Sequence, residues 1–173
     1  TATGLRASVP GNRHCRRMGR VCGVPADALW LMARTPPGTR ADYRAFRILP
    51  TRWQDNDEYG HLNNATYYAL FDTAVSLWQM DQGIEIRGHN ATRFLVVESG
   101  CRYHAELGFP DILTAGIRIA HIGTSSFRYE IALFGNDSDI AGAEGFFTQV
   151  HVGPDNRPAP LPETIQTILQ HLT

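Results

Sequence analysis

Hydrophobic and polar positions alternate in several short segments between Tyr43 and Val152. The clearest alternation covers residues 126–134, where every second residue is apolar, as on the buried face of a strand. Further strands are predicted over residues 43–53, 93–107, 112–122 and 140–152. The polar connections at 108–111, 123–125 and 135–139 are short, which favours antiparallel neighbours. The apolar positions of the clearest strand are Phe127, Tyr129, Ile131 and Leu133.

The segment between the first two predicted strands has the spacing of a helix. Asn63 or Asn64 can cap its N-terminus, and Gly83 can end it in a left-handed conformation. Its apolar residues recur every three or four positions: Tyr67, Phe71, Ala74, Val75 and Trp78. A second, short helix is predicted over residues 162–172. This order of elements predicts an α+β fold in which a curved antiparallel sheet wraps around one long central helix.

The first 41 residues differ from the rest of the chain. They show neither the helical period nor the strand period in their apolar residues. They are rich in Gly and Pro, and they carry seven arginines against the single acid Asp27. We expect residues 1–41 to be a disordered or non-native extension, with translation starting at Met32 or, second, at Met18. Residues 42–173 are then expected to form one folded domain.

Composition excludes several classes of function. Outside the extension there are nine arginines against sixteen acids, and the whole chain has no lysine, which argues against a nucleic-acid surface. No apolar run is long enough to cross a membrane, and no secretory signal pattern is present, so a cytoplasmic protein is expected. The three cysteines, Cys15, Cys22 and Cys101, do not fit a disulfide framework or a zinc site. We therefore expect neither a metal nor a cofactor.

The residues most suggestive of chemistry lie between Arg52 and Trp78. Acids, glycine, histidine and asparagines are concentrated directly before the predicted helix. Such a cluster alone is typical of a helix-entry turn, because Asp and Asn are the usual turn and capping residues. A turn does not explain why so aromatic a helix follows.

This stretch resembles the motif of the hotdog-fold acyl-CoA thioesterases of the 4-hydroxybenzoyl-CoA thioesterase type. In that motif a strand ends in an aromatic residue and x-D-x-D, followed by G-[HI]-[VL]-N-N-x-x-Y and the central helix. The matching positions are Trp53, Asp55, Asp57, Gly60, His61, Leu62, Asn63, Asn64 and Tyr67. The resemblance extends more loosely through residues 122–134.

The resemblance implies a role for each matching residue. Asp57 aligns with the carboxylate that acts as nucleophile or general base, and the backbone N–H of Asn64 with the donor to the thioester carbonyl. His61 is a further catalytic candidate, whereas Asp55 is expected to be a turn acceptor. The expected substrate-binding residues are Gly60, Asn63 and Tyr67, together with Thr124, Ser125 and Ser126, which stand where many members have Lys or Arg.

The function expected from these residues is hydrolysis of an acyl-CoA to free acid and thiol. A helix N-terminus stabilises an oxyanion, and a thiolate needs little protonation to leave because a thiol's pKa is only about 8.5. The alternatives are a non-catalytic acyl-CoA or acyl-carrier-protein binding module and, in the same fold, a hydratase. The resemblance also implies a homo-oligomer, dimer or tetramer, with a site shared between subunits.

Overall fold

A computed structural model describes residues 35–173 of the chain, and one compact unit spans Pro36–Thr173. The hypotheses about Cys15, Cys22 and a start at Met18 or Met32 lie outside the described residues. The unit begins at Pro36 rather than at the expected boundary, Asp42.

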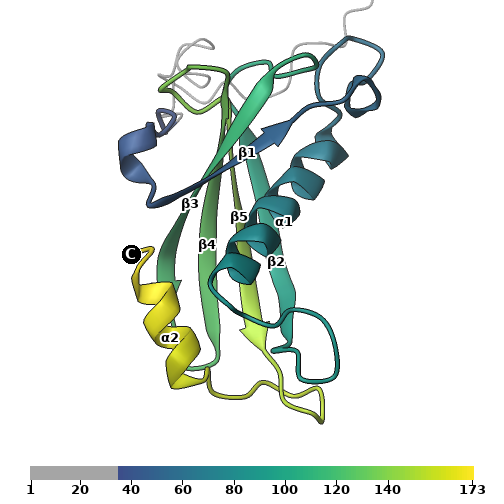
Figure 1. Cartoon of the computed structure of the whole chain (residues 1–173). Helices are drawn as coiled ribbons and strands as arrows, with labels where there is room; N and C mark the ends of the chain where they lie inside the picture. Colours follow the sequence, from purple (N-terminus) through teal and green to yellow (C-terminus); the bar gives the residue numbers. More distant parts are fainter. Residues whose placement is uncertain (1–34) are drawn as a thin grey trace, which may run out of the picture. The chain divides into compact units, whose positions relative to one another are not determined.

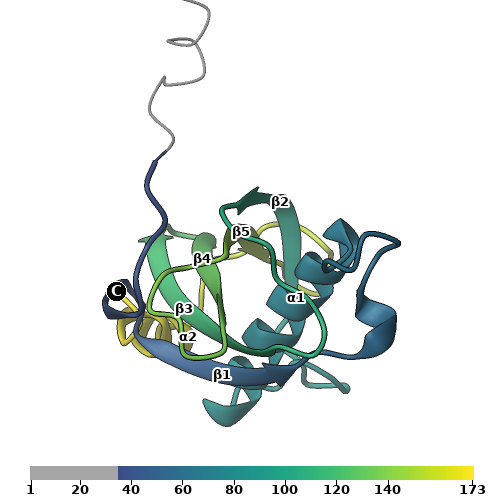
Figure 2. The ribbon, with the colours of Figure 1, turned by 90° about the horizontal axis from the view of Figure 1, so that it is seen from above.

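Five antiparallel strands form one sheet in the order β1-β3-β4-β5-β2 (Figure 1). They are β1 (Ala45–Pro50), β2 (Phe94–Tyr103), β3 (Ile112–Ile122), β4 (Ser126–Gly135) and β5 (Ala143–His151). The sheet curves around the helix α1 (Asn64–Asp81), as the view along the strands shows (Figure 2). The short helix α2 (Glu163–Gln170) contacts β3. The predicted α+β fold, a curved antiparallel sheet around a long helix, is confirmed.

The core lies between α1 and the concave face of the sheet. All five apolar positions predicted for the helix stripe are buried, and so are the four alternating positions of β4. Phe71 presses so closely on β5 that a Cβ at Gly145 would come within 2.3 Å of its ring. Glycine at position 145 therefore permits the close contact between helix and sheet.

Three predicted strands are shorter in the structure. β1 covers Ala45–Pro50 rather than residues 43–53, because Pro50 ends it and Trp53 lies in a short helical turn. β2 ends at Tyr103 rather than Leu107 because the N–H groups of His104 and Ala105 both donate to the carbonyl of Gly142, which turns the chain away from β5. β5 begins at Ala143 rather than Ile140, because Ala141 donates to Gly38 in the segment before β1. The loop after β2 is thereby released from the sheet.

The segment before β1 packs on the opposite face of the sheet. Tyr43 forms a small buried cluster with Ala132, Phe134 and Ala141. It lies against Gly116, where a Cβ would come within 2.9 Å of its side chain. These contacts explain why the compact unit extends beyond Asp42 toward the N-terminus. Within residues 35–173, no helix has the length and apolar character needed to span a membrane.

Candidate active site

The loop between β1 and α1 is fixed by Asp55. Its buried carboxylate accepts from the backbone N–H of Arg52 at 2.7 Å and pairs with the Arg52 guanidinium at 2.7 Å. The carbonyl of Asp55 accepts from the N–H of Asn63 at 2.9 Å. Asp55 therefore connects the short helical turn Trp53–Asp55 to the start of α1, and its carboxylate is already occupied.

Asp57 lies in a tight turn that engages only one of its carboxylate oxygens. Oδ1 accepts from the N–H groups of Tyr59 at 2.9 Å and His61 at 3.3 Å. Gly60 closes the turn with a φ of 85°, a conformation that glycine adopts without strain. Among residues 35–173, Oδ2 of Asp57 has no hydrogen-bond partner, so one oxygen is held in place and the other is free.

The N-terminus of α1 leaves one backbone donor available. The N–H of Ala65 donates to the side-chain oxygen of Asn63, the capping residue, at 2.9 Å, and the N–H of Thr66 donates to the carbonyl of Asn63 at 2.8 Å. Leu62 and Asn63 use their own N–H groups in contacts with Leu107 and Asp55. Within the described residues only the N–H of Asn64 in this run has no acceptor, at the end of the helix where the dipole is positive.

Asp57 and Asn64 both line one pocket of about 430 Å³. One wall comes from the loop and α1, and includes Asp57, Asn63, Asn64 and Tyr67. The other wall is the end of β2 and the segment after it, residues 103–106. His61 lines the pocket as well, with Nε2 3.2 Å from a carboxylate oxygen of Glu106.

Two tyrosines form the apolar side of this pocket. Tyr67 is buried and meets Tyr103 edge to face, with ring centroids 4.9 Å apart. Burial, followed by the nearby Cys101 and Asp57, raises the pKa of Tyr67 to about 12. Burial and Cys101 likewise raise the pKa of Tyr103 to about 12. Both hydroxyls therefore stay neutral at pH 7.

The wall formed by residues 103–106 was not predicted from the sequence. His104, expected to be part of a strand, lies in the pocket wall, with Nε2 2.8 Å from Oε2 of Glu144. Oε1 of the same carboxylate accepts from the Tyr43 hydroxyl at 2.9 Å. No local signal could have identified His104, because its partner lies 40 positions further along the chain.

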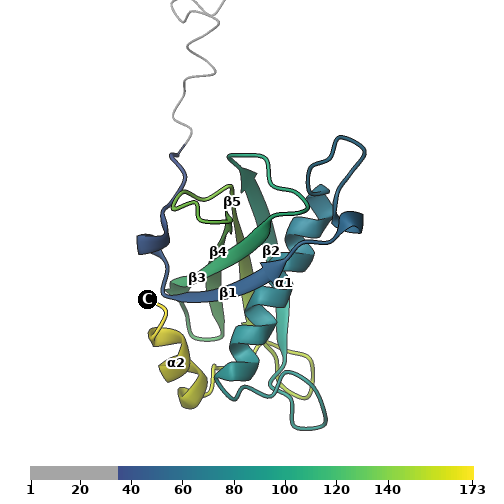
Figure 3. The same ribbon diagram turned by 45° about the horizontal axis from the view of Figure 1, so that its top comes forward.

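Not every expected site residue lines the pocket. Gly60 shapes the turn instead, and its carbonyl lies so close to Gly108 that a Cβ there would come within 2.7 Å. The turn carrying Thr124, Ser125 and Ser126 joins β3 to β4 at the end of the sheet away from the start of α1 (Figures 1 and 3). In this position the carbonyl of Thr124 accepts from Leu161 and that of Ser125 from His151. One subunit therefore does not bring Thr124, Ser125 and Ser126 to Asp57.

No group of three or more His, Cys, Asp or Glu side chains in the described part of the chain is arranged to hold a metal ion.

The fold is a hotdog fold, and a carboxylate, Asp57, lines one pocket together with Asn64 at the N-terminus of the central helix. The sequence profile of the Thioesterase-like superfamily matches residues 51–169, and the chain belongs to this family. No curated protein matches the chain.

The chain also resembles several solved structures. The chain is 42% identical to the PA5185 protein of Pseudomonas aeruginosa strain PAO1, with a TM-score of 0.75, over 79% of this chain and 96% of that one. It is 28% identical to PA2801, a putative thioesterase of Pseudomonas aeruginosa, with a TM-score of 0.67 over 72% and 97%. It is 25% identical to a thioesterase of Thermus thermophilus complexed with coenzyme A and Zn, with a TM-score of 0.62 over 76% and 95%.

Proposed function

We propose that this protein is an acyl-CoA thioesterase in which Asp57 is the catalytic carboxylate. The observation that carries the proposal is that Asp57, with its free Oδ2, and Asn64, with its free N–H, line the same pocket. The membership in the superfamily and the likeness to a thioesterase complexed with coenzyme A support the substrate class.

The proposed chemistry follows from these two groups. The N–H of Asn64 donates to the thioester carbonyl and, with the helix dipole, stabilises the negative charge that develops on its oxygen. Asp57 either takes a proton from the water that attacks the carbonyl carbon or attacks that carbon itself, forming an anhydride that water then hydrolyses. The C–S bond breaks and coenzyme A leaves as a thiolate. A single turnover in ¹⁸O-labelled water separates the two routes, since attack of water on the aspartyl carbon of an anhydride puts label into Asp57.

Replacing Asp57 by Asn is the principal test. Asn keeps the Oδ1 acceptor for the N–H groups of Tyr59 and His61 but removes the anion, so the turn survives. We expect kcat to fall at least about a hundredfold while substrate binding persists, measured as release of free thiol from a panel of acyl-CoAs.

Glu58→Gln is the matched control, because Glu58 is an exposed carboxylate on the same loop that does not line the pocket. Its kcat should stay within about twofold of the wild type. An unchanged kcat in Asp57→Asn would refute the role of Asp57. Tight binding of acyl-CoA by a wild-type protein without any turnover would favour the non-catalytic binding module.

We also propose a homodimer that pairs β2 with the β2 of a second subunit. β2 is an edge strand with exposed Leu95, Val96 and Val97. Antiparallel pairing about a twofold axis brings the Phe94 end of one β2 toward the Tyr103 end of the other. The turn with Thr124, Ser125 and Ser126 lies near the Phe94 end, so in this dimer it approaches the pocket of the other subunit.

A further inference from the structure

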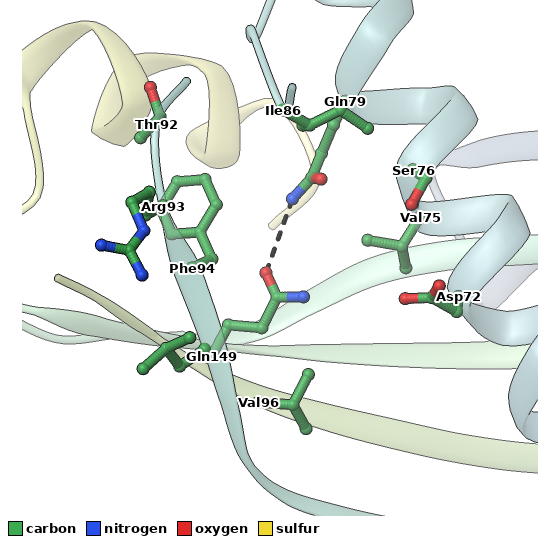
Figure 4. Close-up of a pocket in the computed structure, with 11 residues that line it drawn as sticks. Asp72, Val75, Ser76, Gln79, Ile86, Thr92, Arg93, Phe94, Val96 and Gln149 are labelled. Carbon is green, nitrogen blue, oxygen red and sulfur yellow. Dashed lines mark hydrogen bonds between the residues drawn. The ribbon is translucent and has the colours of Figure 1, made fainter. Parts of the chain in front are cut away.

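A second pocket, of about 340 Å³, lies between the C-terminal half of α1 and the start of β2 (Figure 4). It shares no residue with the pocket of Asp57. Val75, Phe94 and Val96 give it an apolar side, while Asp72 and Ser76 give it a polar one. This mixture is unlike the uniformly apolar wall that a plain alkyl chain requires.

The floor of the pocket is a pair of buried glutamines. Gln79 and Gln149 are only 5% and 6% exposed. Nε2 of Gln79 donates to Oε1 of Gln149 at 3.5 Å and to the hydroxyl oxygen of the buried Tyr129 at 3.3 Å. This leaves two groups without a partner among residues 35–173: the side-chain oxygen of Gln79 and the side-chain nitrogen of Gln149.

These two atoms are directed into the pocket. Figure 4 shows both on the side of the glutamine pair that faces Asp72 and Ser76. In the described part of the chain, only Nε of Arg47 is a fully enclosed side-chain nitrogen or oxygen without a hydrogen bond, so the two amide atoms are open to the pocket rather than sealed in the core. If both amides were turned over, so that oxygen and nitrogen exchanged places, the two unpaired atoms would still be one donor beside one acceptor.

We propose that this pocket binds the far part of the acyl group and selects an acyl chain that carries a hydroxyl. The inference rests on the proposed function and names the substrate class of that enzyme. A hydroxyl donates to the oxygen of Gln79 and accepts from the nitrogen of Gln149, while the carbon chain packs on Phe94 and Val96. An unsubstituted chain leaves both amide atoms desolvated and unpaired, which disfavours it.

The position of the pocket on α1 suits an elongated substrate. Tyr67 lines the first pocket and Asp72 the second, and the five positions from one to the other correspond to a rise of about 7.5 Å along the helix axis. An acyl group held at its carbonyl by Asn64 can follow the helix into the second pocket.

The test uses straight-chain acyl-CoAs of increasing length, each paired with its ω-hydroxy counterpart. At the chain length that reaches the glutamines, we expect kcat/KM of the hydroxylated member to exceed that of its partner by at least about tenfold. In Gln79→Leu/Gln149→Leu the ratio should fall to about one. Gln149→Met is the second variant, because it leaves the contact of Gln79 with Tyr129 intact and nearly conserves volume.

Titration calorimetry on the Asp57→Asn variant measures the same preference without turnover. If the wild type hydrolyses no acyl-CoA but Asp57→Asn binds the hydroxylated member at least about tenfold more tightly, and Gln149→Met in that background removes the difference, the proposed function fails and the pocket assignment stands. Hydrolysis of both members with equal kcat/KM at every length overturns the pocket assignment alone. If the wild type hydrolyses neither member and Asp57→Asn binds neither, both the proposed function and the pocket assignment are overturned.

Discussion

Asp55 and Asp57 are the same residue type two positions apart, yet their surroundings differ completely. The carboxylate of Asp55 is buried and held by Arg52, whose hydrogen bond lowers its pKa. Asp57 has one oxygen anchored by backbone N–H groups and the other without a partner among residues 35–173, and the residue lines the pocket. A carboxylate that is already paired is a poor nucleophile or base, so a structural role is expected for Asp55, and Asp57 is the one that the proposed chemistry uses.

Asp55→Asn should therefore reduce stability rather than turnover. The variant keeps an acceptor oxygen but loses the charge opposite Arg52, and about 1 kcal/mol of the free energy of unfolding should be lost, a fall in Tm of about 4 °C. Thermal denaturation at pH 7 and kcat at a temperature well below Tm measure the two effects. A large loss of kcat with an unchanged Tm would exchange the roles of the two aspartates.

The same ion pair predicts a dependence of stability on pH. Because the folded-state pKa of Asp55 is lowered from 3.8, its contribution is fully present above about pH 4 and is lost as the pH falls through the lowered value. The difference in Tm between wild type and Asp55→Asn should therefore shrink below about pH 4. A difference that stayed constant down to pH 2 would show that the charge of Asp55 is not what stabilises the loop.

At the scale of elements, the two edges of the sheet differ. β1 is short and ends at Pro50, which cannot donate to another strand, whereas β2 has ten residues and exposed apolar side chains. Both edges expose apolar residues, including Ile48 on β1 and Val97 on β2. The length of β2 makes it the better surface for pairing with a second copy.

Val97→Lys should weaken the dimer, because two such strands would place positive charges and their hydration shells in the shared sheet. Light scattering at micromolar concentration should show a shift of mass toward the monomer. Ile48→Lys, the same change on the other edge, is the control and should leave the mass unchanged. If only Ile48→Lys dissociated the protein, β1 rather than β2 would carry the interface.

At the scale of the whole unit, the segment before β1 is tied to the pocket through one carboxylate. Glu144 accepts from the Tyr43 hydroxyl and, at 3.3 Å, from the N–H of Gly38, while its other oxygen faces His104 in the pocket wall. Burial and the charge of Glu144 raise the pKa of Tyr43, which keeps its hydroxyl a donor. Through Glu144, the N-terminal contacts thus help to position His104 in the pocket wall.

Truncation separates this segment from the residues before it. A chain that begins at Arg44 loses the buried Tyr43 and should melt at least about 5 °C lower, whereas a chain that begins at Met32 should keep its Tm and activity. Differential scanning calorimetry on both forms measures the effect. An equal Tm for the two truncations would show that the Tyr43 cluster contributes nothing to stability.

Local spacing in the sequence was enough to predict the helix stripe, the alternation of β4, the caps of α1 and the Asp57 turn. Each of these features depends on residues only a few positions apart, so it follows from local helix, strand and turn geometry alone. The tertiary structure decided which segments meet. β2 returns to the far edge beside β5, which places residues 103–106 opposite Asp57 and leaves Thr124, Ser125 and Ser126 at the other end of the sheet. Gln79 and Gln149, 70 positions apart, become neighbours for the same reason: strand order sets long-range contacts, and no local period records it.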